Sequence, residues 1–259
     1  MSGEAPDARP IDHQGRPVIE KVKADREIII PEGHRRGEQM TLGQRMMYRF
    51  LWWVVQIVGR TYFRLSITGR EKVPTSGAFI LSPIHRSNLD TPIVAAITRR
   101  RLRYMGKESL WKNRFGAWFL TTAGGFPVER ASADRAALRA AVEVLERGEP
   151  LVMFPEGTRQ FGPTVRELFE GPAYLAIRTQ CPIVPVGIGG TERALGKGRK
   201  FPRPTKIAIV VGDPILPPPK GEGGRVSRRA TRELTARLGT EIQRLFDEAQ
   251  ALTGHPNTS

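Results

Sequence analysis

His85 and Asp90 lie five residues apart in the stretch SPIHRSNLDTP, where an apolar, strand-like run gives way to a helical pattern. A histidine accepts protons near neutral pH, and a carboxylate on its other ring nitrogen fixes the tautomer and stabilises the imidazolium that forms. The same residues have a structural interpretation, with His85 bonded to a backbone carbonyl and Asp90 as the N-cap of the next helix. The pair therefore indicates either a general base with its partner or a helix start.

A second unusual string, FPEGTR, spans residues 154–159 and also follows an apolar run. A glycine-containing turn leaves backbone N–H groups free, and Arg159 offers a planar fork of donors that matches a phosphate. The alternative is a surface turn in which Glu156 pairs with Arg159. Together, the two strings predict proton abstraction beside a bound phosphate.

Two further strings follow strand-like runs, GFPVER at residues 125–130 and VPVGI at residues 184–188. In this order the four strings resemble the motifs of the glycerolipid acyltransferase superfamily, most closely the 1-acylglycerol-3-phosphate acyltransferases, over about residues 65–215. The resemblance implies transfer of a fatty acyl group from acyl-CoA or an acyl carrier protein directly to a hydroxyl of the acceptor. It implies no covalent acyl-enzyme and no cofactor beyond the acyl-donor substrate.

The resemblance also implies roles for particular residues. His85 is expected to be the catalytic base and Asp90 its partner, and Glu156 is assigned to a glycerol hydroxyl or to orienting an arginine. Within these motifs, the groups expected to bind the acceptor phosphate are Arg130, Arg159, Thr158 and the Gly157 N–H. Lys107, in the separate string MGKESLW, is a further candidate that the resemblance does not supply. The residues expected near the acyl thioester are Val184, Pro185 and Val186.

Other functions remain open. Family members often carry a lysine where this chain has Glu170, which keeps glycerol-3-phosphate, a lysophospholipid or a glycolipid open as acceptor. A non-catalytic basic membrane-binding module is the alternative from a different class. Ser87 lies outside any Gly-x-Ser-x-Gly elbow, and Cys181 is expected to be a buried small hydrophobe. No metal is expected, because the remaining histidines lie in polar terminal segments without ligand spacing.

The chain of 259 residues has a formal net charge of +15, and residues 41–259 hold 34 basic and 18 acidic side chains. Such a balance suits nucleic acid, an anionic membrane or anionic substrates. No nucleic-acid-binding signature is present, so we expect an anionic phospholipid surface, an acyl thioester and a lipid acceptor as partners and no nucleic acid. The single cysteine permits no internal disulfide, which fits a reducing compartment.

Residues 42–64 have apolar side chains at helical spacing and several arginines on the opposite face. The uninterrupted apolar run, residues 50–55, is far shorter than the ~20 residues that a membrane-spanning helix needs. We expect the helix to lie on the membrane surface, and the alternative is that it packs on the domain core. The expected membrane contacts are Phe50, Trp52, Trp53, Ile57, Arg45, Arg49 and Arg60. The protein would then be peripheral or monotopic at the cytoplasmic face of the plasma membrane.

The remaining pattern predicts a single α/β domain with a central mixed sheet of about seven strands flanked by helices and preceded by the amphipathic interfacial helix. The expected segments are a polar, disordered tail at residues 1–40, the surface helix at 41–64 and the catalytic domain at 65–215. A linker at residues 216–224 and a C-terminal amphipathic helix at 225–252, packed on the domain, complete the chain.

Overall fold

The computed structural model describes residues 40–128, 133–196 and 198–257. The tail up to residue 39 and Arg130 lie outside these ranges. Seven strands form one sheet in the order β1-β7-β6-β2-β5-β3-β4. Their bounds are β1 Ser66–Thr68, β2 Ile80–Pro83, β3 Arg103–Lys107, β4 Gly125–Val128, β5 Leu151–Val152, β6 Ile183–Gly189 and β7 Ala208–Val211. Every neighbouring pair is parallel except β6 and β7, which confirms the predicted α/β class and mixed sheet.

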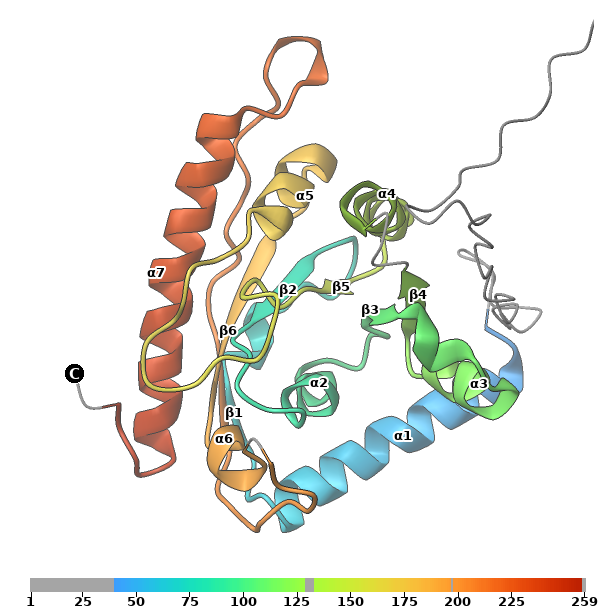
Figure 1. Cartoon of the computed structure of the whole chain (residues 1–259), viewed down its shortest axis with the longest axis vertical. Helices are drawn as coiled ribbons and strands as arrows, with labels where there is room; N and C mark the ends of the chain where they lie inside the picture. Colours follow the sequence, from blue (N-terminus) through green and yellow to red (C-terminus); the bar gives the residue numbers. More distant parts are fainter. Residues whose placement is uncertain (1–39, 129–132, 197, 258–259) are drawn as a thin grey trace, which may run out of the picture.

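Helices cover both faces of the sheet, with α4, α5 and α7 on one side and α1, α2 and α3 on the other (Figure 1). Their bounds are α1 Leu42–Thr61, α2 Asp90–Ile93, α3 Arg114–Thr122, α4 Ala133–Glu146, α5 Gly171–Thr179, α6 Thr191–Ala194 and α7 Arg228–Leu252. Short 3₁₀ turns lie at η1 Arg70–Lys72, η2 Val94–Ile97, η3 Glu108–Trp111 and η4 Glu222–Gly224.

The C-terminal helix α7 packs closely on the central strand β6. Leu238, Ile242 and Leu245 are buried against the sheet at the spacing of one helix face. Gly187 of β6 allows the approach, because a Cβ there would lie 2.2 Å from the backbone carbonyl of Leu245. Glycine therefore sets how near α7 comes to the sheet.

Four neighbouring parallel strands, β2, β5, β3 and β4, end at the same edge of the sheet. His85 follows β2, the FPEGTR turn follows β5 and Lys107 is the last residue of β3. In open α/β sheets, ligands bind outside the carboxyl ends of the strands. The topology therefore gathers the His85 turn, the FPEGTR turn and Lys107 at one edge.

Candidate active site

His85 and Asp90 form a direct pair. The ring Nδ1 of His85 lies 3.0 Å from Oδ2 of Asp90, and the two side chains are 15% and 0% exposed. A buried carboxylate accepts a hydrogen bond from Nδ1–H, which leaves Nε2 of the ring as the proton acceptor. The Phe154 ring stacks on the His85 ring at 4.0 Å between centroids, so the two motifs are in contact.

Asp90 holds the turn that carries His85. Its Oδ2 also accepts hydrogen bonds from the backbone N–H groups of Arg86 and Ser87, both at 2.6 Å. The expected N-cap role is wrong, because α2 begins at Asp90 itself and the N-cap position is occupied by Leu89 without a side-chain cap. The carboxylate points back into the preceding turn, where it fixes both the ring and the backbone.

A buried ion pair lies beneath this turn. Both carboxylate oxygens of Glu156 accept from Nη1 of Arg86, at 2.9 and 2.7 Å, and the two side chains are at most 1% exposed. Glu156 also accepts from the backbone N–H of His85 at 3.1 Å and of Arg166 at 3.1 Å. The carboxylate has no exposed surface, so the structure does not bear out contact with a glycerol hydroxyl or a surface pair with Arg159. The other expectation, that Glu156 orients an arginine, fits Arg86.

Arg86 is a residue that the sequence reasoning missed. Its Nε and Nη2 donate to the carbonyl oxygens of Gly162 and Thr164 at 3.3 and 3.0 Å, and its guanidinium lies 5.1 Å from the centre of the Phe246 ring. Arg86 therefore links the His85 turn to the loop after FPEGTR and to α7. The signal in the sequence was only its position beside His85, which does not distinguish a buried arginine from a solvated one.

The FPEGTR turn presents its last residues to solvent. Thr158 and Arg159 are exposed, and the backbone N–H of Gln160 donates to the His85 carbonyl at 2.9 Å. The expectation of a free Gly157 N–H is wrong, because that group donates to the Phe154 carbonyl at 3.1 Å and closes the turn. Gly157 instead supplies the backbone shape, with φ of 68°.

Lys107 is exposed at the end of β3, two strand positions from β2 along the edge that carries His85. The segment Val184–Val186 lies in the middle of the sheet instead. Val184 and Val186 have no exposed surface, and the residues pair in register with Leu81–Pro83 of β2. Apolar side chains on a central strand are packed between the helical layers, and the contact of this segment with the acyl thioester stays a prediction.

Other polar candidates have structural partners. The Ser87 hydroxyl donates to the Leu195 carbonyl at 2.7 Å. Cys181 is buried, as predicted, and burial raises the pKa of its thiol. Within the described ranges, no three His, Cys, Asp or Glu side chains gather as they would around a metal ion.

Helix α1 exposes its apolar face and docks through polar groups. Phe50, Trp53 and Ile57 are 61%, 54% and 56% exposed. Gln56 is buried and donates through Nε2 to the Ala96 carbonyl at 2.9 Å, while Nε1 of Trp52 donates to the Thr98 carbonyl at 2.8 Å. The alternative that the apolar face packs on the core is therefore wrong, and so is the assignment of Trp52 to the outer face.

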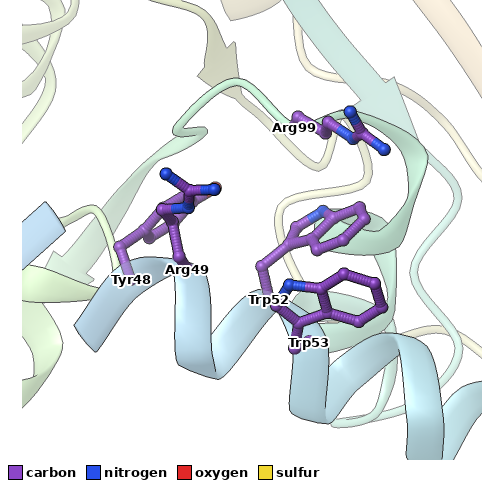
Figure 2. Close-up of a pocket in the computed structure, with 5 residues that line it drawn as sticks. All are labelled: Tyr48, Arg49, Trp52, Trp53 and Arg99. Atoms are coloured by element: carbon purple, nitrogen blue, oxygen red, sulfur yellow. The ribbon is translucent and has the colours of Figure 1, made fainter. Parts of the chain in front are cut away.

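A cavity of about 370 Å³ lies between α1 and the segment after η2, lined by Tyr48, Arg49, Trp52, Trp53 and Arg99 (Figure 2). The guanidinium of Arg99 lies 5.7 Å from the centre of the Trp52 ring, and Trp53 packs edge-on against the other side of that ring (Figure 2). Arg45 and Arg49 are exposed, and Arg60 donates to Oε1 of Gln56 at 2.6 Å. Across the described ranges, no helix combines the length and apolarity needed to cross a bilayer.

Comparisons with known proteins agree with this geometry. The model of the family described as Acyltransferase matches residues 64–189. The 1-acyl-sn-glycerol-3-phosphate acyltransferase of Bacillus subtilis (strain 168) is 23% identical over 170 residues, which are 65% of this chain and 82% of that protein. The enzyme of the same name from Streptococcus pneumoniae is 24% identical over 216 residues, covering 80% and 76% of the two chains.

The crystal structure of the 1-acyl-sn-glycerophosphate (LPA) acyltransferase PlsC from Thermotoga maritima has the same fold. Its TM-score is 0.65 at 25% sequence identity, over 82% of this chain and 85% of that one. The family match spans the His85–Asp90 pair, the FPEGTR turn and the sheet edge that brings them together. These matches in sequence and in fold support the assignment of the chain to the glycerolipid acyltransferases, which are O-acyltransferases.

Proposed function

We propose that this enzyme acts in phospholipid synthesis and transfers a fatty acyl group from acyl-CoA or an acyl carrier protein to the free hydroxyl of a 1-acylglycerol-3-phosphate. The observation that carries the proposal is the contact between the His85–Asp90 pair and the FPEGTR turn. It puts a proton acceptor and an exposed arginine at one edge of the sheet. The relatives from Bacillus and Streptococcus, named for this activity, support the choice of acceptor.

The reaction needs a base because a glycerol hydroxyl is a poor nucleophile at neutral pH. Nε2 of His85 takes the hydroxyl proton while the oxygen attacks the thioester carbonyl carbon. The new C–O bond forms, the C–S bond breaks, and the leaving thiolate takes the proton from the imidazolium. Asp90 holds Nδ1–H and stabilises the charged ring, and a positioned base contributes about 10²–10⁴ in rate. No serine or cysteine of the enzyme carries the acyl group in this scheme.

The acceptor is held by its phosphate. Arg159 is exposed one residue from Gln160, whose backbone is bonded to His85, so the guanidinium and the base belong to one structural unit. Arg159, Thr158 and Lys107 are the described residues that we assign to the phosphate, together with Arg130. Arginine suits this task because its planar fork donates two parallel hydrogen bonds to phosphate oxygens.

The enzyme meets its lipid substrates at the bilayer surface through α1. In this placement Phe50, Trp53 and Ile57 enter the headgroup boundary while Arg45 and Arg49 meet anionic lipids. We assign the protein to the cytoplasmic face of the plasma membrane as a peripheral or monotopic enzyme. Replacing Phe50, Trp53 and Ile57 together with serine is expected to abolish flotation with liposomes. The Leu216→Ser variant, which removes a 72% exposed side chain elsewhere, is the control.

A different lipid acceptor is the second candidate. Glu170, at the position where family members often carry lysine, lies at the N-terminus of α5 with Oε1 3.7 Å from Nε of Arg232. The chain therefore has a carboxylate beside the FPEGTR loop where a further cation would hold a phosphate.

The test is acceptor-dependent release of CoA thiol from one acyl-CoA. The acceptor panel contains 1-acylglycerol-3-phosphate, glycerol-3-phosphate, a lysophosphatidylcholine and a glycolipid, and mass spectrometry identifies the product. We expect 1-acylglycerol-3-phosphate to give the highest kcat/KM and phosphatidic acid as product. A higher kcat/KM with another acceptor would overturn the choice of substrate. The absence of acceptor-dependent release with every acceptor, for a wild-type protein as inactive as His85→Ala, would point to the non-catalytic alternative.

A further inference from the structure

A second cavity, of about 460 Å³, has a lining that includes neither His85 nor Asp90. Five cationic side chains line it, those of Arg64, Arg193, Arg199, Arg203 and Lys206, and we call it the basic cavity. They come from the segment after α1, from α6 and from the loop that leads into β7. The cavity therefore gathers charge from three segments of the chain.

No ion pair between described residues neutralises these charges. Within the described ranges, no carboxylate lies at ion-pair distance from any of the five side chains. Arg193 donates to Oγ1 of Thr253 at 2.6 Å, but its Nε is buried and has no partner among the described residues. Burial lowers the pKa of Arg193, and the negative charge of neighbouring Glu192 only partly offsets this effect. Like charges held together destabilise a fold unless an anion neutralises them, so the arrangement indicates an anion-binding site.

The cavity lies near the C-terminal end of α1. Arg64 lies three residues after the end of that helix, and the Tyr62 hydroxyl donates to the Pro202 carbonyl at 2.9 Å. Figure 1 shows the loop between α6 and β7 beside the C-terminal end of α1. In the same loop, Phe201 is 81% exposed beside the cations. An exposed aromatic ring next to several arginines is typical of the boundary between lipid headgroups and acyl chains.

We propose that the basic cavity binds the phosphate of an anionic phospholipid headgroup in the bilayer surface on which α1 lies. The inference rests on the membrane placement proposed for α1. Arginine forks from Arg199 and Arg203 bind the phosphate oxygens, and Phe201 inserts between neighbouring headgroups. The site fixes the orientation of the domain about α1 and makes membrane affinity depend on anionic lipid.

The nucleotide phosphates of acyl-CoA have the same chemistry. His85 follows β2, and Arg64 of the basic cavity precedes β1, which lies three strand positions from β2 in the sheet. At the usual spacing of neighbouring strands, β1 and β2 are about 14 Å apart. The exposed Phe201 and the contact between Tyr62 and Pro202 favour the lipid, because a water-soluble nucleotide needs neither. The experiment therefore includes both sources of phosphate.

The test uses the full-length Arg199→Ser/Arg203→Ser variant, in which both replaced side chains are exposed. The matched control is Arg225→Ser/Arg228→Ser, which removes the same charge at the N-terminal end of α7. The basic cavity lies at the other end of this helix (Figure 1), where Thr253 and His255 line it. Partition is measured by flotation with phosphatidylcholine vesicles, alone and with increasing phosphatidylglycerol. The cavity variant should lose about thirtyfold in affinity for the anionic vesicles, which corresponds to about 1 kcal/mol per cation. It should bind pure phosphatidylcholine as the wild type does, and the control should change by less than about twofold in both cases.

Three results would overturn the proposal. The first is equal loss in the cavity and control variants, which would mean that the general field of the protein attracts the vesicles. The second is wild-type partition that does not respond to phosphatidylglycerol. The third is unchanged partition of the cavity variant with a large rise in its KM for acyl-CoA, which would assign the cavity to the donor. Failure of the membrane placement itself is distinguishable, because serine at Phe50, Trp53 and Ile57 would then leave binding to both kinds of vesicle intact.

Discussion

Glu156→Gln is the substitution for which the structure gives the sharpest expectation. The amide has nearly the same volume as the carboxylate but no charge, and it directs an NH₂ group at donors that now bond to oxygen. Glu156 accepts from Arg86 through both oxygens and from the backbone N–H groups of His85 and Arg166. Neither side chain of the ion pair is more than 1% exposed, so solvent cannot replace the lost partner. The variant leaves the guanidinium of Arg86 as a buried charge without its counter-ion.

Breaking a buried ion pair from one side costs about 3–5 kcal/mol. For a chain of this size, a loss of about 1 kcal/mol in the free energy of unfolding lowers Tm by about 2 °C, so the expected decrease in Tm is about 6–10 °C. Circular dichroism measures the unfolding, and Glu241→Gln is the matched control. Its partner Arg244 is 54% exposed, so the control should shift Tm by no more than about 2 °C.

A double-mutant cycle with Arg86→Met tests the pairing itself. The double variant Arg86→Met/Glu156→Gln should be more stable than the sum of the two single changes predicts, because it leaves no lone buried charge. Turnover should fall along with stability, since Glu156 also holds the backbone N–H of His85 at 3.1 Å. If Glu156→Gln melted within about 1 °C of the wild type, or the two changes were additive, the ion pair would not hold the site together.

Three further substitutions test the remaining parts of the site. His85→Ala should lower kcat by about 100-fold or more at unchanged Tm, and retention of a tenth of the activity would exclude His85 as the base. Arg159→Lys keeps the charge but loses the fork, so it should raise KM for the acceptor more than for the donor; an unchanged acceptor KM would remove Arg159 from the phosphate site. Gly157→Ala should destabilise the fold by about 1–3 kcal/mol, because φ is 68° and a Cβ would lie 2.5 Å from the Phe169 ring. Gly162→Ala has a similar φ of 85° in open space, so a greater loss there than at Gly157 would contradict the steric argument.

The sequence predicted what depends on local spacing. The interval between His85 and Asp90 is short enough for one turn to join the side chains, and the alternation of apolar runs predicted the sheet. The pair of Arg86 and Glu156 could not be predicted, because 70 residues separate them and only the adjacency of β2 and β5 brings them together. Burial of an arginine is also rare without a partner, so the sequence favours a solvated side chain until the partner is located.

The orientation of α1 shows why periodicity alone cannot say what an amphipathic face contacts. Tyr48, Trp52 and Gln56, spaced four residues apart, donate to the carbonyl oxygens of Arg100, Thr98 and Ala96. Ala96 lies in the last turn of η2, where a helix leaves its last carbonyl groups without partners, and Thr98 and Arg100 lie just after that turn. Polar side chains therefore dock the helix, and its apolar face is directed away from the sheet.

That outward face has an energetic consequence. Its exposed members are Leu42, Met46, Phe50, Trp53, Val54, Ile57 and Val58, each at least 38% exposed. Full burial of one large apolar side chain is worth about 1.5–3 kcal/mol, so covering the remaining exposed surface of this stripe would contribute on the order of 10 kcal/mol. That is comparable with the whole stability of a typical domain, about 5–15 kcal/mol. A contribution of this size, on a helix with exposed arginines in a chain that is similar to lipid acyltransferases, is the reason we propose that a bilayer covers this face.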